Sequence, residues 1–127
     1  MSTLWEMLRR RVLLLLLAAL PALAGRAPAH GLLERSDPRA GSTLKTPPAS
    51  VRLWFTGAIE RAYSRVEVRN EQGQRVDVGE SVVDAVTRKN LKIALPPLPP
   101  GRYQIEWRVL SVDAHVTQGA FTFRVGP

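Results

Sequence analysis

Short segments of the chain alternate between apolar and polar positions, which is the pattern of a strand with one buried face. In residues 51–55 and 121–125, every odd-numbered position carries Val, Leu or Phe. Strand character is expected in seven segments: residues 32–35, 50–55, 65–69, 75–78, 91–95, 103–109 and 120–125. No stretch has convincing helical periodicity, and residues 82–89 are expected to form a turn or loop.

The segments are separated by residues that terminate strands. Asp37-Pro38 and Gly41-Ser42 are typical turn sequences, and residues 96–101 read Pro-Pro-Leu-Pro-Pro-Gly, in which proline cannot donate a ladder hydrogen bond. About seven short strands at this spacing predict an all-β fold, a small immunoglobulin-like β-sandwich or barrel with Greek-key connections. We expect one domain without internal repeats.

Residues 12–20 interrupt this pattern, because they form an unbroken nonpolar run after three arginines at positions 9–11. The run is too short to cross a bilayer as a helix, which takes about 20 apolar residues. Residues 27–29 (Ala-Pro-Ala) follow it and resemble a signal-peptidase site. These features predict a cleaved signal peptide over residues 1–29 and an exported mature domain over residues 30–127.

Cleavage after Ala29 makes His30 the first residue of the mature chain, and an earlier cut after Ala24 or Gly25 is the alternative. Loss of residues 1–29 lowers the net charge from +7 to +4, because four of the 18 basic and one of the 11 acidic residues lie there. The remaining arginines are scattered through alternating strands, which disfavours nucleic-acid binding.

The composition narrows the classes of protein and of site. With 45% hydrophobic and 23% charged residues, the chain resembles a folded domain and not a disordered one. It has no cysteine, and Met1 and Met7 both lie in the predicted signal peptide. A mature chain without sulfur excludes disulfides, Fe–S clusters and thiolate metal sites. About a hundred residues suffice to stabilise such a fold by its core alone.

The two histidines are the strongest candidates for metal chemistry. At a mature N-terminus, the α-amine and the Nδ1 atom of His30 can chelate one ion in a six-membered ring. Asp113 and His115 are two residues apart, so both project from one face if the preceding strand continues in extended form. Nitrogen and oxygen donors in a tetragonal plane suit Cu(II). We therefore expect one Cu(II) ion held by His30, Asp113 and His115.

Other interpretations of these residues stay open. His30 can follow the cut by chance, Asp113 can cap a turn, and His115 can bond a backbone carbonyl. The serines have no persuasive base to activate them, and the chain carries no Gly-rich phosphate loop, His-x-x-x-His pair or catalytic carboxylate pair. We therefore expect no enzymatic activity.

The order of these features resembles the CopC family of periplasmic copper-binding proteins. The resemblance begins at the histidine after the signal peptide and covers essentially the whole mature chain. Its specific part is the stretch from Pro100 to Phe123, which contains Ser111-x-Asp113-x-His115 and Gly119-x-Phe121-x-Phe123.

The resemblance implies a Greek-key β-barrel or sandwich and a Cu(II) site made by His30, Asp113 and His115. It also implies a periplasmic monomer that buffers copper or passes it to a CopD-like inner-membrane transporter. We expect that transporter to be a separate polypeptide. Two departures narrow the expectation: the mature chain has no methionine-rich Cu(I) segment, and Thr-Gly at residues 56–57 replaces a glutamate of some members, with Glu60 as a distant substitute.

Two other classes of function are weighed against this one. The arrangement of one amine and two imidazoles is similar to the histidine brace of copper-dependent polysaccharide monooxygenases, although so small a domain leaves little room for a substrate surface. The other class is a metal-free β-sandwich module for adhesion or assembly, which would not bind Cu(II).

Overall fold

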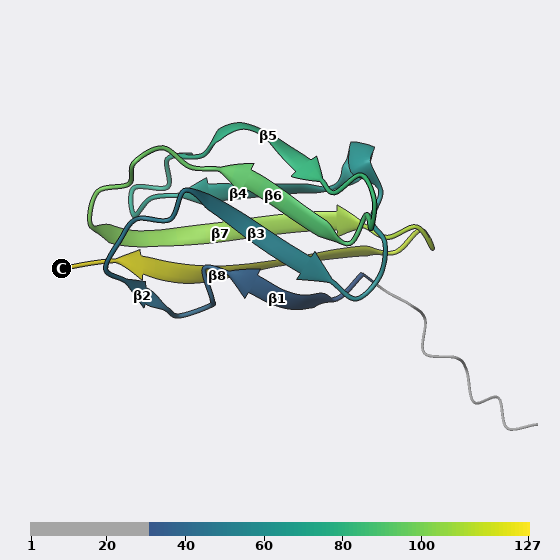
Figure 1. Ribbon diagram of the computed structural model, residues 1–127, viewed down its shortest axis with the longest axis horizontal. Helices are drawn as coiled ribbons and strands as arrows, with labels where there is room; N and C mark the ends of the chain where they lie inside the picture. Colours follow the sequence, from purple (N-terminus) through teal and green to yellow (C-terminus); the bar gives the residue numbers. More distant parts are fainter. Residues whose placement is uncertain (1–30) are drawn as a thin grey trace, which may run out of the picture.

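The computed structural model describes residues 31–127, which fold as two four-stranded sheets packed against each other (Figure 1). The predicted signal peptide over residues 1–29 and the candidate ligand His30 lie outside the described residues. The elements are β1 (Leu33–Asp37), β2 (Thr43–Leu44), β3 (Ser50–Phe55), the 3-10 helix η1 (Arg61–Tyr63), β4 (Arg65–Arg69), β5 (Val78–Val83), β6 (Asn90–Ala94), β7 (Gly101–Leu110) and β8 (Val116–Val125). Within this part of the chain, no helix is long and apolar enough to cross a membrane.

The strand order is β1-β3-β6-β5 in one sheet and β2-β8-β7-β4 in the other. Paired strands are antiparallel, except that β2 runs parallel to β8. The chain crosses repeatedly between the two sheets, so strands that are adjacent in sequence often lie in different layers. The prediction of an all-β sandwich is confirmed, with the two-residue β2 as an addition to the predicted strands.

The core lies between the sheets and is built from alternate positions of the strands. In β3, Val51, Leu53 and Phe55 are buried, and Arg52 between them is exposed. β7 repeats the pattern with Tyr103, Ile105 and Val109. Each buried side chain of this size contributes about 1.5–3 kcal/mol relative to exposure, so the period-two pattern stabilises the sandwich.

One predicted strand is misplaced. Residues 75–78 are predicted to form a strand, but β5 begins only at Val78, and Arg75 pairs with Arg69 of β4 in an isolated bridge. The predicted loop at 82–89 is shorter, because β5 runs to Val83. The side chain of Asp77 explains the difference, because its Oδ2 accepts a hydrogen bond from the Val68 N–H of β4 (2.8 Å). A carboxylate thus replaces the backbone acceptor that a neighbouring strand would supply. Residues 78–80 are all exposed, so no alternation marks the start of β5.

The β7–β8 hairpin positions the candidate site. The two strands pair from Gly101↔Val125 to Leu110↔Val116, and β8 begins four residues before the predicted segment 120–125. The polar residues Thr117 and Gln118 and the small Gly119 hide this extension in the sequence. The ribbon shows the turn of this hairpin at the opposite end of the sandwich from the C-terminus (Figure 1).

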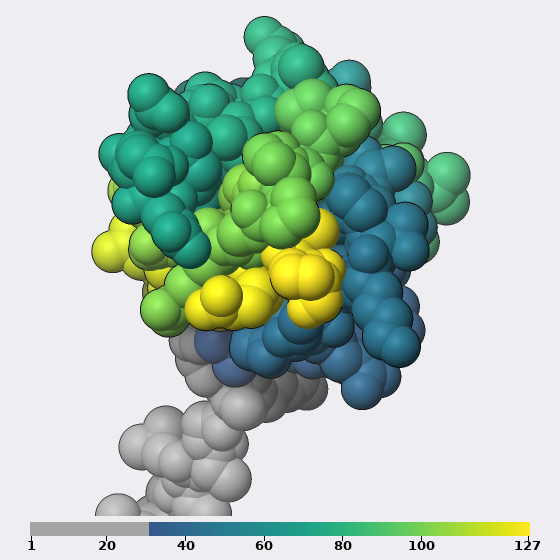
Figure 2. Space-filling model, turned by 90° about the vertical axis from the view of Figure 1, so that its left-hand side faces the viewer, coloured from purple at the N-terminus to yellow at the C-terminus, as the bar shows by residue number. Residues whose placement is uncertain are grey.

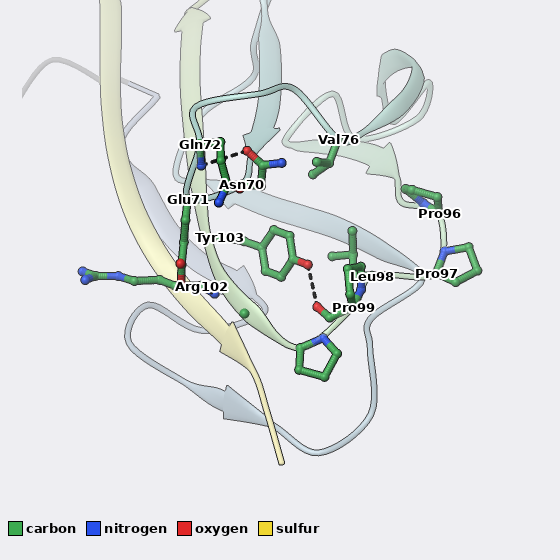
Figure 3. Close-up of a pocket in the computed structure, with 12 residues that line it drawn as sticks. Asn70, Glu71, Gln72, Val76, Pro96, Pro97, Leu98, Pro99, Arg102 and Tyr103 are labelled. Carbon is green, nitrogen blue, oxygen red and sulfur yellow. Dashed lines mark hydrogen bonds between the residues drawn. The ribbon is translucent and has the colours of Figure 1, made fainter.

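The other end of the sandwich is closed by a proline-rich corner. The Tyr103 hydroxyl donates a hydrogen bond to the Pro99 carbonyl oxygen (2.5 Å), four residues upstream (Figure 3). A tyrosine near the start of a strand that bonds back to the preceding corner is a hallmark of immunoglobulin-like sandwiches. In the space-filling view of this end, the last residues lie against the chain around residue 100 (Figure 2).

Candidate metal centre

The turn between β7 and β8 carries two of the three predicted ligands. Two backbone hydrogen bonds close it: the Ser111 N–H donates to the His115 carbonyl oxygen and the Ala114 N–H donates to the Ser111 carbonyl oxygen, each at 2.9 Å. Ala114 has a φ of +68°, in the left-handed region. The expectation that an extended strand continues through Asp113 is therefore wrong, because β7 ends at Leu110.

The turn nevertheless brings the two predicted side chains together. Asp113 Oδ1 lies 3.3 Å from His115 Nδ1, and the two side chains are 32% and 56% exposed. The Ser111 hydroxyl donates a hydrogen bond to Asp113 Oδ1. This bond, followed by the interaction with His115, lowers the pKa of the Asp113 carboxyl below its ordinary value. An ionised carboxylate therefore stands beside an imidazole at neutral pH.

Ser111 also belongs to this site, although it is not one of the predicted ligands. Its side chain is buried, and it contacts the backbone of His115 as well as the carboxylate of Asp113. The His115 N–H donates to Ser111 Oγ (3.3 Å), and the same Oγ lies 3.1 Å from the His115 carbonyl oxygen. The spacing of polar residues at 111, 113 and 115 was the available signal.

The first described residues are attached beside this turn. The Thr117 hydroxyl donates to the Gly31 carbonyl oxygen (2.8 Å), across 86 positions of sequence. A Cβ atom placed on Gly31 would lie 3.2 Å from Ile59 Cγ2 and 3.5 Å from Ser111 Cβ, so the backbone approaches closely there. Gly31 thus lies against the serine that holds the Asp113–His115 pair.

The connection between β3 and β4 carries Glu60, the distant substitute for a further carboxylate ligand. Glu60 lies at this end of the sandwich, since its N–H donates to the Leu110 carbonyl oxygen (2.7 Å). Its Oε2 is 3.3 Å from Arg88 Nη2, in an ion pair. Among residues 31–127, no group of three or more His, Cys, Asp or Glu side chains is close enough to hold a metal ion. Within the described residues, no third side chain of these types therefore joins the Asp113–His115 pair.

A cavity of about 340 Å³ at the proline-rich end offers no comparable chemistry (Figure 3). Several of the polar groups around it are hydrogen-bonded within the protein. Asn70 Oδ1 accepts from the Gln72 N–H (3.1 Å), and Glu71 Oε1 accepts from the Arg102 N–H (3.0 Å). Tyr103 bonds to the corner itself, so this cavity is a structural feature of the sandwich.

Comparison with known proteins identifies the family. The sequence profile of the CopC domain matches residues 33–126. The chain belongs to the CopC family. The resemblance in the sequence is thereby confirmed, and membership of a family of copper resistance proteins also bears out the prediction that this chain is not an enzyme.

Several curated relatives of this CopC-family chain are named for copper. It is 31% identical over 121 residues to Copper transport protein CutJ of Bacillus subtilis, a match that covers 94% of the chain and 22% of CutJ. It is 30% identical over 107 residues to Copper resistance protein C of Escherichia coli, covering 78% of the chain and 83% of that protein. The chain therefore spans about a fifth of CutJ but most of the other relative.

Solved structures of the family share its fold. CopC from Methylosinus trichosporium OB3b has a TM-score of 0.72 and 33% identity, over 77% of this chain and 95% of that one. PcoC, a methionine-rich copper resistance protein from Escherichia coli, has a TM-score of 0.66 and 28% identity, over 76% and 99% of the two chains. This chain differs from PcoC in having no methionine after residue 7.

Proposed function

We propose that this CopC-family protein is a periplasmic copper carrier, which binds one Cu(II) ion through His30, Asp113 and His115 once the signal peptide is removed. The observation that carries the proposal is the meeting of two segments at one end of the sandwich. Gly31 lies against Ser111, and Ser111 holds the Asp113–His115 pair.

Covalent geometry supports His30 as the missing donor. Residue 30 is one peptide bond from Gly31, and consecutive Cα atoms are about 3.8 Å apart. The Gly31 backbone is held by Thr117, two residues after His115. The amine and imidazole of residue 30 are therefore proposed as the further donors, since the Gly31 backbone that follows them is held beside the Asp113–His115 turn.

The donor set favours the oxidised ion. The α-amine and two imidazoles supply nitrogen, and Asp113 supplies oxygen. Such ligands suit Cu(II), whereas Cu(I) prefers the sulfur of cysteine and methionine, and the chain has neither after residue 7. We therefore expect the mature protein to bind Cu(II) and to bind Cu(I) far more weakly.

A role in copper delivery is supported by the relatives. One of them is a copper transport protein of which this chain matches 22%, and several are copper resistance proteins. We infer that the carrier buffers Cu(II) in the periplasm as a monomer and passes it to a CopD-like transporter in the inner membrane.

The decisive experiment changes the amine without changing any side chain. The exported protein beginning at His30 is compared with a variant carrying one extra Gly ahead of His30, which turns the amine into an amide. We expect the variant to keep the far-UV circular dichroism of the parent but to bind Cu(II) much more weakly, with a different electron paramagnetic resonance spectrum. His115→Ala, with the natural N-terminus, should also fold and lose copper.

Each alternative has a distinct outcome. Equal affinity and equal spectra with the extra Gly would show that the N-terminal nitrogen is not a ligand. Absence of Cu(II) in equilibrium dialysis of the exported protein would favour a metal-free module. Tight Cu(I) binding, measured by competition with a Cu(I) chelator, would contradict the assignment of the oxidation state.

A further inference from the structure

Ser111 is a buried polar residue whose hydroxyl is hydrogen-bonded within the protein. It is 1% exposed and pairs with Ile59, which is fully buried, in an isolated β-bridge. A hydroxyl removed from water is unfavourable unless it is hydrogen-bonded. The side-chain hydroxyl of Ser111 contacts both predicted copper ligands of the turn, Asp113 and His115.

The contacts of Ser111 act on the two ligands in different ways. At Asp113, the hydroxyl donates to the carboxylate itself, so it fixes the orientation of the oxygen atoms. At His115, Ser111 Oγ accepts from the backbone N–H (3.3 Å), so it fixes the main chain from which the imidazole projects. The turn between them passes through Ala114 in the left-handed region. The Ser111 side chain therefore constrains both the carboxylate of Asp113 and the backbone of His115.

Ser111 also connects this turn to the N-terminal segment. Its Cβ would lie 3.5 Å from a Cβ placed on Gly31, the first residue described. The serine is thus packed between the segment that follows His30 and the pair formed by Asp113 and His115. Small size and a hydroxyl are both needed at such a position.

We propose that Ser111 is a positioning residue for copper, which holds the Asp113–His115 turn in its binding geometry before the ion arrives. The inference rests on the proposed function. Groups that orient metal ligands from behind change metal affinity by about 10- to 100-fold when they are removed. Because the hydroxyl itself is not a ligand, its loss weakens binding without abolishing it.

The test compares Ser111→Ala with Ser64→Ala in the exported protein with its natural N-terminus. Ser64 is the matched control, because it is the other buried serine of the described residues and its hydroxyl accepts from the Leu110 N–H (3.2 Å) without contacting Asp113 or His115. We expect Ser111→Ala to lower Cu(II) affinity by about 10- to 100-fold and to change the electron paramagnetic resonance spectrum. Ser64→Ala should leave both unchanged, whatever its effect on stability.

A second pair of variants separates the hydroxyl from the shape of the side chain. Ser111→Thr keeps the hydroxyl and Ser111→Val has the same outline without it, so the threonine variant should bind Cu(II) more tightly than the valine variant. If Ser111→Ala does not fold, the comparison of the threonine and valine variants still tests the role of the hydroxyl. Equal affinities and spectra in wild type and Ser111→Ala, or in the Thr and Val variants, would overturn the role of Ser111 while leaving the copper site intact. A wild-type protein that binds no Cu(II) would instead refute the proposed function, and this inference with it.

Discussion

Gly119 of β8 lies directly under the indole of Trp107, and this contact predicts the effect of a single methyl group. The two residues are paired across the β7–β8 hairpin. A Cβ atom added at Gly119 would lie 2.8 Å from Trp107 Cζ2, 2.9 Å from Cε2 and 3.0 Å from Nε1. Carbon atoms are in favourable contact at about 3.5–4.0 Å, so the indole must move by more than half an ångström.

The indole is partly buried, and Phe55 limits its movement on one side. Its ring packs edge-on against Phe55, with centroids 5.4 Å apart, and Phe55 is fully buried in the core. Overpacking of this kind costs about 1–3 kcal/mol. For a domain of about 100 residues, Gly119→Ala should therefore lower the Tm by about 5–20 °C. Gly126→Ala is the control, since its Cβ would meet Thr43 Cγ2 at 3.4 Å, close to ordinary contact.

A double-mutant cycle assigns the cost to the indole. Urea unfolding followed by far-UV circular dichroism gives the free energy of unfolding of the wild type, Gly119→Ala, Trp107→Leu and the double variant. If the clash is the cause, Gly119→Ala should cost much less in the Trp107→Leu background, with a coupling energy of about 1 kcal/mol or more. A cost for Gly119→Ala that is the same in both backgrounds, or no larger than that of Gly126→Ala, would refute the argument.

Three further predictions concern the turn regions. Thr117→Val removes the donor to the Gly31 carbonyl, worth about 1 kcal/mol, so competition titration should show Cu(II) binding weakened by about fivefold with the fold retained. Ala114→Gly relieves the positive φ and should raise the free energy of unfolding in urea by up to about 1 kcal/mol, and a decrease would contradict this. The N–H and then the hydroxyl of Thr87 lower the pKa of Asp84, so this carboxylate stabilises the fold above its unfolded pKa. The stability gap between wild type and Asp84→Ala, measured in urea, should therefore narrow as pH falls through the lowered pKa of Asp84.

The sequence predicts best those strands whose environment differs on their two faces. β3 and β4 match their predicted segments, because each buries one face and exposes the other. β5 does not, because it is an edge strand whose first three residues are all exposed. The backbone N–H groups of Val66 and Val68 in β4 donate hydrogen bonds to the side chains of Ser81 and Asp77, and hydrophobic periodicity does not reveal an acceptor that a side chain supplies.

For the candidate site, the sequence predicts which residues come together but not the backbone that brings them together. The proximity of Asp113 and His115 follows from their separation of two residues, but the reason given for it, an extended strand, is wrong. Their relation comes from a turn closed through Ser111 and a left-handed Ala114. Alanine gives no warning of a positive φ, since glycine and asparagine are the residues expected there. The convergence with Gly31 is a tertiary contact, which spacing along the chain does not encode.

The hydrophobic core and the proposed copper site occupy different parts of the sandwich. The buried hydrophobic side chains form one cluster between the sheets, whereas the N-terminal segment and the β7–β8 turn meet at one end of the sandwich, outside that cluster. The proposed ligands depend on the cluster for their placement, because the Thr117–Gly31 bond joins segments 86 positions apart. The cluster contains none of the proposed ligands, so we expect the protein to remain folded without the ion. A Cu(II) ion bound at this end would act as a ligand of the folded state alone. It would add stability that grows with the logarithm of its concentration over Kd, about 2.7 kcal/mol at a hundred times Kd.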